Sequence, residues 1–416
     1  MNKTQILSHR STFLTKQAQE AWNYFSKSGY PSSKDENWWF SNPSPWLLQS
    51  LVPLTDKEDI KREEFGAYII PGTIPILILN DSVSILNTLP AGVQIMDMAQ
   101  ADSEHLMDLP LGSIADIHTS SFSAENTALF QNGILITISE NTVLDKPIQL
   151  IHSIKMNKDS RIYPRIYVNV GSSSQIEILQ TEVGGDDSQH FVNSVTEVFV
   201  QENAQLKWTL MQKWNVQTGQ VSSFNIALKK NASASYNTFE FGGGFIRRDI
   251  HSHLQSTGAD FAINSLFVPT AKQHIDIFSI VHHKGSYCSS RQLIKGVLGG
   301  ISRGVFRGLA HVYDKAKKTD AQQTNHNLLL SNKARMNSIP QLEIYEDDVK
   351  CSHGSTTGQI DEEAVFYLRS RGISRMEALE LMVKGFANEV LDKVENSKLK
   401  THIQNVLIQK MESMMQ

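Results

Sequence analysis

The feature that most constrains the fold is a run of strand-like segments that extends over about residues 133–358. Apolar and polar side chains alternate within it, as at Ile166, Val168 and Val170 and again over residues 204–210. Alternation with a period of two residues buries one face of a strand and leaves the other face to solvent. We therefore predict a mainly β fold. A doubly wound α/β sheet is excluded, because no long amphipathic helix separates one strand from the next.

A weaker repeat with a longer period overlies this alternation. Three successive segments each contain a strand, a small polar turn and a second strand, and their turns begin at Gly171, Gln201 and Leu228. These turns are 30 and 27 residues apart, within the range of about 20–45 residues found in stacked-coil proteins. A β-helix is one interpretation. An antiparallel sandwich with long hairpins is the other, and periodicity alone favours the sandwich.

The segments on either side of this run have different patterns. Residues 4–27 carry apolar side chains at helical spacing, residues 66–100 contain short apolar runs broken by Pro and Gly, and residues 101–130 are mostly helical and polar in character. The expected division of the chain has three parts, namely a helix-rich N-terminal domain (1–132), the strand core (133–358) and a helical C-terminal segment (359–416).

The C-terminal segment carries signals for the start of two helices. Asp361 can cap a short helix that Gly372 ends, and Ser374 with Glu377 matches the capping box of the next helix. This second helix has one apolar stripe, made up of Leu379, Met382, Val383, Phe386 and Val390. Two or three helices cannot form a core of their own. The stripe is therefore expected to pack on the strand core or on another chain, and spacing alone favours the core.

Composition and motifs exclude several classes of function. A net charge of −4 over 416 residues gives no reason to expect nucleic acid or an anionic membrane as a partner. The two cysteines, Cys288 and Cys351, are too few for a disulfide framework or a four-cysteine metal site, and they fit a reducing cytosol. The N-terminus lacks the apolar core of a signal peptide, and the most apolar run, residues 68–79, is shorter than the ~20 residues of a membrane helix. We expect a cytoplasmic protein.

No motif for bond-making chemistry is present. The sequence lacks the Walker A phosphate loop and the H-E-x-x-H zinc motif. Gly242–Gly244 lack the strand-to-helix context of a phosphate loop, and we interpret them as a turn. We therefore expect a protein that is not an enzyme.

Cys351 and His353 form the strongest candidate pair of metal ligands. They stand two residues apart in a strand-like segment, so their side chains are predicted to point to the same face. A thiolate with an imidazole suits an iron–sulfur cluster or zinc, but two ligands are too few for a closed site. Spacing alone favours a buried strand cysteine beside a hydrogen-bonded or exposed histidine. A metal site would need further ligands from another chain.

Four other histidines stand in pairs to which the sequence assigns no role. His251 and His253 would share one face of a strand, whereas the adjacent His282 and His283 would point in opposite directions. Cys288 has no partner ligand nearby in sequence, and we interpret it as a packing residue.

A long segment near the C-terminus resembles a known family. It reads KTDAQQTNHNLLLSNKARMNSIP, followed by QLEIYEDDVKCSHGSTTGQIDEEAVFYLRSRGIS. It resembles the C-terminal signature of the SufB/SufD family of the SUF iron–sulfur cluster assembly system. Weaker matches are SSRQLIKGVL, FQNGILITI and GYPSSKDENWWF. The SufB branch has a functional cysteine where Leu368 stands here and lacks the KCSHG run of residues 350–354, so the resemblance is to the SufD branch.

The resemblance implies a right-handed parallel β-helix flanked by an N-terminal helical domain and a C-terminal helical segment. This implication replaces the sandwich that periodicity alone favours. It also implies a heterodimer with a SufB-type paralogue through the C-terminal region of the β-helix, and a SufC-type ATPase on the C-terminal helices. The isolated chain is a possible homodimer. Neither nucleic acid nor a membrane is expected as a partner.

The resemblance also implies roles for residues. His353, with Cys351 as a second candidate, would contribute to a nascent iron–sulfur cluster shared with the SufB-type partner. No cofactor would stay bound to this chain alone. The SufC-type ATPase would dock on side chains of the capped helix, namely Met376, Leu379, Met382, Val383 and Phe386. The chain would be a non-catalytic scaffold component that hands clusters to acceptor proteins.

Two other functions remain as alternatives. One is a SufB-like chain that forms a self-sufficient homodimeric scaffold, and the missing cysteine at Leu368 argues against it. The other is a β-helix carbohydrate-active enzyme, which would need clustered carboxylates and basic residues on one strand face. No such cluster is evident in the sequence.

Overall fold

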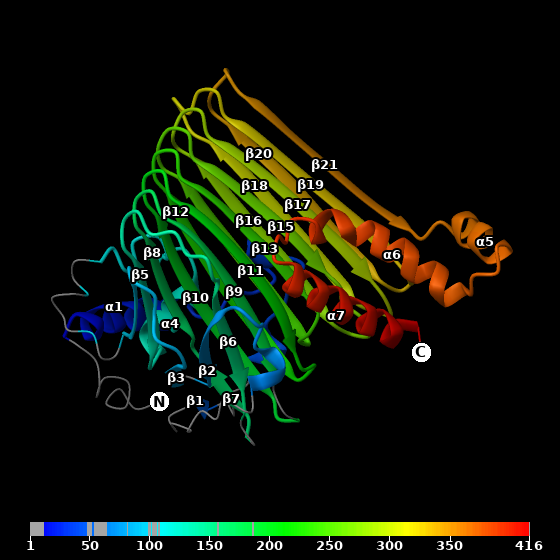
Figure 1. Cartoon of the computed structure of the whole chain (residues 1–416), viewed down its shortest axis with the longest axis horizontal. Helices are drawn as coiled ribbons and strands as arrows, with labels where there is room; N and C mark the ends of the chain where they lie inside the picture. The colour runs from blue at the N-terminus through cyan, green and yellow to red at the C-terminus, as the bar shows by residue number, and fades with distance from the viewer. Residues whose placement is uncertain are drawn as a thin grey trace.

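The computed structural model describes residues 12–47, 52–53, 65–80, 82–98, 101, 106, 109–155, 158–184 and 187–415. Its main body is a stack of coils, each built from β-strands (Figure 1). Two C-terminal helices lie along one side of this stack, and the helices near the N-terminus lie against the first coils (Figure 1).

The strands form two sheets, and successive strands of the core alternate between them. Sheet A contains, in pairing order, β20 (Arg335–Ile344), β18 (Arg303–Val312), β16 (His274–His283), β14 (Phe245–Leu254), β12 (Thr218–Leu228), β10 (His190–Val200), β8 (Arg165–Val170), β5 (Gly133–Ile138) and β4 (Val93–Asp97). The short strand β7 (Ser160–Ile162) pairs with β10 and with β1 (Val52–Pro53).

Sheet B faces sheet A across the interior. It contains, in pairing order, β21 (Lys350–Gln359), β19 (Asp320–Leu329), β17 (Ser289–Leu298), β15 (Asp260–Phe267), β13 (Ser233–Glu240), β11 (Gln205–Trp214), β9 (Gln175–Gly184), β6 (Ile148–Ile154), β2 (Ile74–Leu79) and β3 (Ser82–Ile85).

The coils stack by parallel pairing. Strand β10 pairs with β12, β11 with β13, and so on to β19 with β21, each pair parallel and without an offset. The result is a parallel β-solenoid of about seven turns, which confirms the parallel β-helix that the family resemblance implies. The antiparallel sandwich is wrong. Alternation reports only which face of a strand is buried, and that face is the same in both folds. The direction of pairing depends on the turns.

The turns explain why the sequence repeats every 27 to 30 residues. Ser173, Asn203 and Asn231 have φ values between 53° and 59°, and they occupy the same place in three successive turns. Ser173 donates its backbone N–H to the carbonyl of Glu202 at 2.9 Å, and Asn203 donates to Lys230 at 3.0 Å. Asparagine enters this left-handed region more readily than most residues. Each turn is therefore hydrogen-bonded to the next coil, which fixes the pitch of the stack.

The interior changes from apolar to polar along the solenoid. One inward-facing stack, in which each residue pairs with the next, contains Ile178, Trp208, Tyr236, Ile263, Gln292, Gln323 and His353. A second such stack contains Ile176, Leu206, Ala234, Phe261, Ser290, Ala321 and Cys351. Burial of apolar surface contributes roughly 25 cal/mol per Å², so the apolar parts of these stacks stabilise the fold more than the polar parts near the last coil.

The N-terminal part of the chain contributes strands to both sheets. Strand β2 extends sheet B in parallel, and β3 and β4 then pair antiparallel with β2 and β5. These are the short strands expected within residues 66–100. Because β4 pairs with β5 across residue 132, the sheet runs through the expected domain boundary, and the division of the chain into domains stays a prediction.

Helices cover the outer face of sheet A over the first coils. Helices α1 (Thr12–Ser28) and α4 (Ser121–Leu129) pack on its apolar side chains, which include Tyr163, Tyr167 and Phe199. Of the helix expected over residues 4–27, the part from Thr12 is present, and residues 4–11 lie outside the described residues. Three short 3-10 helices are η1 (Glu36–Trp38), η2 (Ser44–Trp46) and η3 (Gly66–Tyr68).

Three helices follow the last strand, namely α5 (Glu362–Ser370), α6 (Arg375–Leu391) and α7 (Ser397–Met415). The expected caps are confirmed. The Asp361 carboxylate accepts from two backbone N–H groups of α5, and Ser374 with Glu377 forms the complete capping box of α6. Helices α6 and α7 cover the outer face of sheet B, and α5 projects beyond it (Figure 1). No helix in the described part of the chain is long and apolar enough to span a membrane.

Candidate functional site

The C-terminal end of the solenoid is open. Among the described strands, β20 pairs only with β18 and β21 only with β19, so the other edge of each carries unpaired backbone groups. Every residue of β21 is at least partly exposed. An uncovered strand edge is a template for pairing with another chain. The last coil is therefore the natural place for a partner with a similar edge.

Cys351 and His353 lie at this open end, on β21. They pair with Ala321 and Gln323 of β19, whose side chains are buried in the interior, so both point to the inner face of the last coil, as their spacing predicts. Cys351 is half-buried and His353 is exposed. Burial raises the pKa of the Cys351 thiol, although a hydrogen bond with the backbone of Ala321 opposes this shift. A metal that binds here must therefore displace a firmly held proton.

The floor beneath this pair is polar. Ser338 Oγ donates to Asn325 Oδ1 at 2.7 Å and lies 2.7 Å from Ser355 Oγ. Gln323 is only 2% exposed, yet its amide nitrogen and oxygen both lack a hydrogen-bond partner among the described residues. A buried polar group without a partner costs about 1–3 kcal/mol. The open end is thus built to receive hydrogen-bonding groups instead of an apolar cap.

Metal ligands within the chain are incomplete. No group of three or more His, Cys, Asp and Glu side chains in the described residues is arranged to hold a metal ion. Cys351 and His353 are brought together, as their spacing predicts, but no other side chain in the described part of the chain completes a site around them. Their role as ligands stays a prediction.

Comparison with known families decides which protein family this solenoid represents. A family model described as "SUF system FeS cluster assembly, SufBD core domain" matches residues 153–386, and one described as "SufBD protein N-terminal region" matches residues 1–150. The chain belongs to the SufB/SufD family. Its members take part in iron–sulfur cluster assembly by the SUF system.

Individual relatives place the chain on the SufD side of the SufB/SufD family. The iron-sulfur cluster assembly protein SufD of Escherichia coli (strain K12) is 27% identical over 390 residues, which cover 93% of this chain and 90% of the relative. The iron-sulfur cluster assembly SufBD family protein slr0076 of Synechocystis is 27% identical over 94% of this chain and 90% of its own length. Protein ABCI7, chloroplastic, of Arabidopsis thaliana is 27% identical over 90% of this chain and 82% of its own length.

The apolar stripe of α6 packs mainly on this SufD-like chain itself. Leu379 and Val383 are buried, Met382 and Phe386 are half-buried, and the Lys295 ammonium lies 4.6 Å from the centre of the Phe386 ring. Of the five side chains expected to dock a SufC-type ATPase, only Met376 is exposed. The stripe thus follows the first of the two alternatives that its spacing left open, packing on the strand core. Docking of a partner stays a prediction.

Other side chains on α5 and α6 present an apolar surface that the sequence pattern did not single out. It is formed by Phe366 (72% exposed), Tyr367 (58%), Leu381 (50%) and Met376 (40%). Helix α5 contacts the rest of the chain through a small cluster that contains Val365, Leu368 and Leu379. The signal in the sequence was the adjacent Phe and Tyr on a nine-residue helix, since both cannot be buried on one narrow face.

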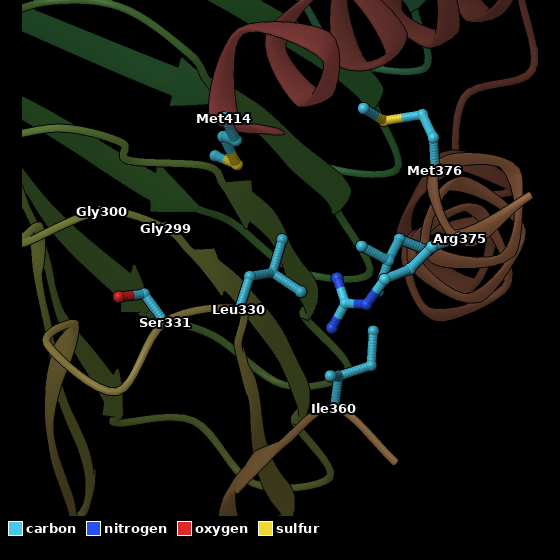
Figure 2. Close-up of a pocket in the computed structure, with 9 residues that line it drawn as sticks. Gly299, Gly300, Leu330, Ser331, Ile360, Arg375, Met376 and Met414 are labelled. Atoms are coloured by element: carbon cyan, nitrogen blue, oxygen red, sulfur yellow. The ribbon is translucent and has the colours of Figure 1, made fainter. Parts of the chain in front are cut away.

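A pocket of about 480 Å³ lies where α6 and α7 meet the solenoid. Figure 2 shows its walls, which come from the turn at Gly299, from Leu330, from Ile360 and from the side chains of Met376 and Met414. Arg375 also lines it, and its guanidinium donates to Glu362 at 2.7 Å. The pocket lies next to the exposed apolar surface of α5 and α6, so it belongs to the same candidate docking region.

Charged side chains also cluster inside the solenoid, but out of reach of substrate. Arg248 Nε lies 2.9 Å from Glu240 Oε1, and Arg248 Nη2 lies 3.3 Å from Glu182 Oε2. All three side chains are buried. Burial is the largest influence on the pKa of Glu240 and raises it. This is a cluster of carboxylates and a base that the sequence pattern missed, and its burial fits a structural role.

The paired histidines of the sequence separate as expected. His283 points into the solenoid, where its Nε2 lies 2.8 Å from Ser290 Oγ, and His282 points outward. This confirms their predicted opposite directions. His251 and His253 lie on the outer face of sheet A and line a pocket of about 640 Å³ under the N-terminal segment.

Proposed function

We propose that this chain is a non-catalytic scaffold component that pairs end to end with a SufB-type paralogue and carries a SufC-type ATPase. The observation that supports this proposal most strongly is the open last coil. It holds His353 and Cys351 on an inner face, and the residues that the structure describes supply no third ligand there. A nascent iron–sulfur cluster would be the cargo of the assembly, and this chain alone would retain none.

The pairing would use the free edges of β20 and β21. Both strands have ten residues. On their other edges, β20 pairs with β18 and β21 with β19, in parallel and residue by residue along the whole strand. A partner solenoid could add its own last coil with the same geometry, so that the polar floor around Gln323 becomes the middle of one continuous interior. This arrangement would also give the orphaned amide of Gln323 a partner.

The cluster would form at the junction of the two solenoids. His353 would supply a neutral imidazole, and the partner would supply the thiolates that a cluster needs. Cys351 is the weaker candidate, because burial raises the pKa of its thiol. Neither side chain would break or form a covalent bond in the carried group.

The ATPase would dock on α5 and α6. The exposed surface of Phe366, Tyr367, Met376 and Leu381 supports this part of the proposal, since patches of this kind mark interaction sites. Dimerisation of the ATPase on binding ATP would then pull on α5 and α6. Because these helices follow directly from β21, the pull would open the junction and admit iron and sulfide.

Replacement of His353 by alanine tests the cluster role. In a complex co-expressed with a SufB-type and a SufC-type protein, we expect His353→Ala to leave assembly of the complex intact and to abolish cluster formation, measured by anaerobic absorption spectroscopy. Ser352→Ala, which changes the neighbouring exposed side chain on the opposite face of β21, is the matched control. Cluster formation by the His353 variant at the parental rate would rule out the ligand role.

The two alternative functions predict different results when the isolated chain is assayed. A self-sufficient homodimeric scaffold would bind a stable cluster when iron and sulfide are added to the chain alone, whereas our proposal predicts little or none. A carbohydrate-active enzyme would show lyase or hydrolase activity in the isolated chain. We expect no activity, because the carboxylates clustered around Arg248 are buried.

A further inference from the structure

Three histidines form a ladder on the outer face of sheet A, and the ladder runs toward the last strand of that sheet, β20. His253 pairs with His282, and His282 pairs with His311, so the three occupy equivalent places in successive coils. They are spaced 29 residues apart in the sequence. Glu343 of β20 pairs with His311 and ends the ladder. No role for this ladder follows from the proposed scaffold function.

Neighbouring rings of the ladder pack in two different geometries, one stacked and one tilted. The rings of His253 and His282 are stacked, with centroids 4.7 Å apart and planes 5° apart. Those of His282 and His311 have centroids 6.0 Å apart and are tilted by 47°. A metal ion lies in the plane of each imidazole that binds it, so parallel stacked rings cannot share one ion, whereas tilted neighbours can turn toward a common point.

Each of the two tilted rings is held through the same nitrogen. His311 Nδ1 lies 2.8 Å from Glu343 Oε2, and His282 Nδ1 lies 3.2 Å from the hydroxyl of Tyr313. An Nδ1–H that donates to an oxygen leaves Nε2 with its lone pair. A histidine that binds a metal ion through one ring nitrogen typically donates the N–H of its other ring nitrogen to a carboxylate or another oxygen in this way.

Burial opposes protonation of His253 and His282. Burial, and then the nearby Lys284 and His251, lower the pKa of His253 to about 4, and burial with the neighbouring histidines and Lys284 lowers that of His282 to about 3. Tyr313, Tyr345 and Glu343 also face the ladder. The Lys284 ammonium opposes a cation, so the expected affinity is moderate.

We propose that His282 and His311 form a site for a divalent transition metal ion, with Glu343 and Tyr313 as positioning residues. Imidazole suits zinc, copper, iron and nickel. With two protein ligands the site is an open one, and water would fill the remaining positions. His253 and His282 line the pocket of about 640 Å³, through which an ion could reach them. This site is separate from Cys351 and His353 and does not depend on the proposed function.

Calorimetric titration with Zn²⁺ tests this site. The full-length chain would carry Cys351→Ser and His353→Ala, so that the open end does not contribute. We expect one bound ion per chain, and at least tenfold weaker binding after His282→Gln or His311→Gln. Glu343→Gln should weaken binding about tenfold, because loss of such a positioning group typically costs 10–100-fold in metal affinity. His326→Gln on β19 of the other sheet is the matched control and should leave binding unchanged.

A second readout covers variants that do not fold. In the chain with ¹⁵N-labelled histidines, Zn²⁺ should shift the Nε2 resonances of His282 and His311 and leave that of His326 in place. Absence of one-to-one binding, or equal affinity in the His282, His311 and His326 variants, would show that the ladder only stacks. A shift confined to histidines outside the ladder would overturn the proposal in the same way.

Discussion

The two ends of the solenoid differ in the length and pairing of their edge strands. At the first end, β3 and β4 turn back and pair antiparallel with their neighbours, and α1 and α4 cover the outer face beside them. At the last end, β20 and β21 stop with free edges. Short edge strands resist pairing with another chain and long ones invite it. Strands β3 and β4 have four and five residues, whereas β20 and β21 have ten each, which supports the interface proposed at the last end.

The interior changes in the same direction as the ends. The stack that begins with Ile178 and Trp208 runs through Gln292 and Gln323 to His353 at the open edge. Along one line of side chains, the chain thus passes from apolar packing to groups that need hydrogen-bond partners. The same position in the coil is therefore buried in the core in the middle of the molecule and exposed at its end, where the proposed partner would bind.

The largest expected effect comes from the apolar half of this stack. Trp208→Ala removes a fully buried side chain that packs on Phe224 and Tyr236. It should lower the free energy of unfolding by about 3–5 kcal/mol, measured by denaturant titration. His353→Ala, at the exposed end of the same stack, should stay within about 0.5 kcal/mol of the parent. Equal losses at both positions would remove the distinction between core and interface.

The next effect concerns the free edge itself. Ile344 is exposed on β20 at the open end. Ile344→Asp should weaken binding of a SufB-type partner at least tenfold, which corresponds to about 1.4 kcal/mol, while thermal stability changes little. Ile301→Asp makes the same change at an exposed turn between β17 and β18 and should bind normally. Loss of binding in both variants, or in neither, would place the interface elsewhere.

A third prediction separates the docking surface of α5 and α6 from their buried face. Phe366→Asp should release a SufC-type ATPase in a pull-down assay and leave the SufB-type partner bound, because Phe366 is exposed. Val383→Asp buries a charge against sheet B and should instead unfold α6, seen as a lower melting temperature. Retention of the ATPase by the Phe366 variant would mean that the exposed surface is not its docking site.

The smallest effect compares the two cysteines. Burial raises the pKa of both thiols, so at pH 8 each holds a smaller thiolate fraction than an ordinary cysteine and should alkylate more slowly. Cys288 is buried in a middle coil, whereas Cys351 is half-exposed at the open end. Iodoacetamide should therefore modify Cys351 before Cys288, as followed by mass spectrometry, and both rates should rise with pH. A SufB-type partner should protect Cys351 alone, and faster modification of Cys288 would contradict the placement of the two thiols.

Local features of the fold could be predicted from the sequence. Alternation gave the strands of the core, and the capping signals at Asp361 and Ser374 gave the starts of α5 and α6, because each depends only on neighbouring residues. Alternation could not decide between a sandwich and a solenoid, since the pairing direction depends on turns such as those at Ser173 and Asn203. The family resemblance supplied that step.

The candidate site was predictable only in part. The spacing of Cys351 and His353 predicts a shared face, but not that the face lies at an uncovered end, which depends on the absence of a further coil. The exposure of Phe366 depends on how α5 sits relative to sheet B. The histidine ladder requires unshifted pairing of coils 29 residues apart, a register that the pairs at His251 and His282 alone could not reveal.

Hydrogen exchange at the open end tests the central claim most directly. Amide exchange of residues 335–359, which span β20 and β21, would be followed by mass spectrometry in the free chain and after addition of a SufB-type partner. We expect fast amide exchange in β20 and β21 of the free chain and strong protection of these amides once the partner is bound. Exchange in β11 and β13 should change little. Protection confined to other parts of the chain, with β20 and β21 unchanged, would contradict end-to-end pairing.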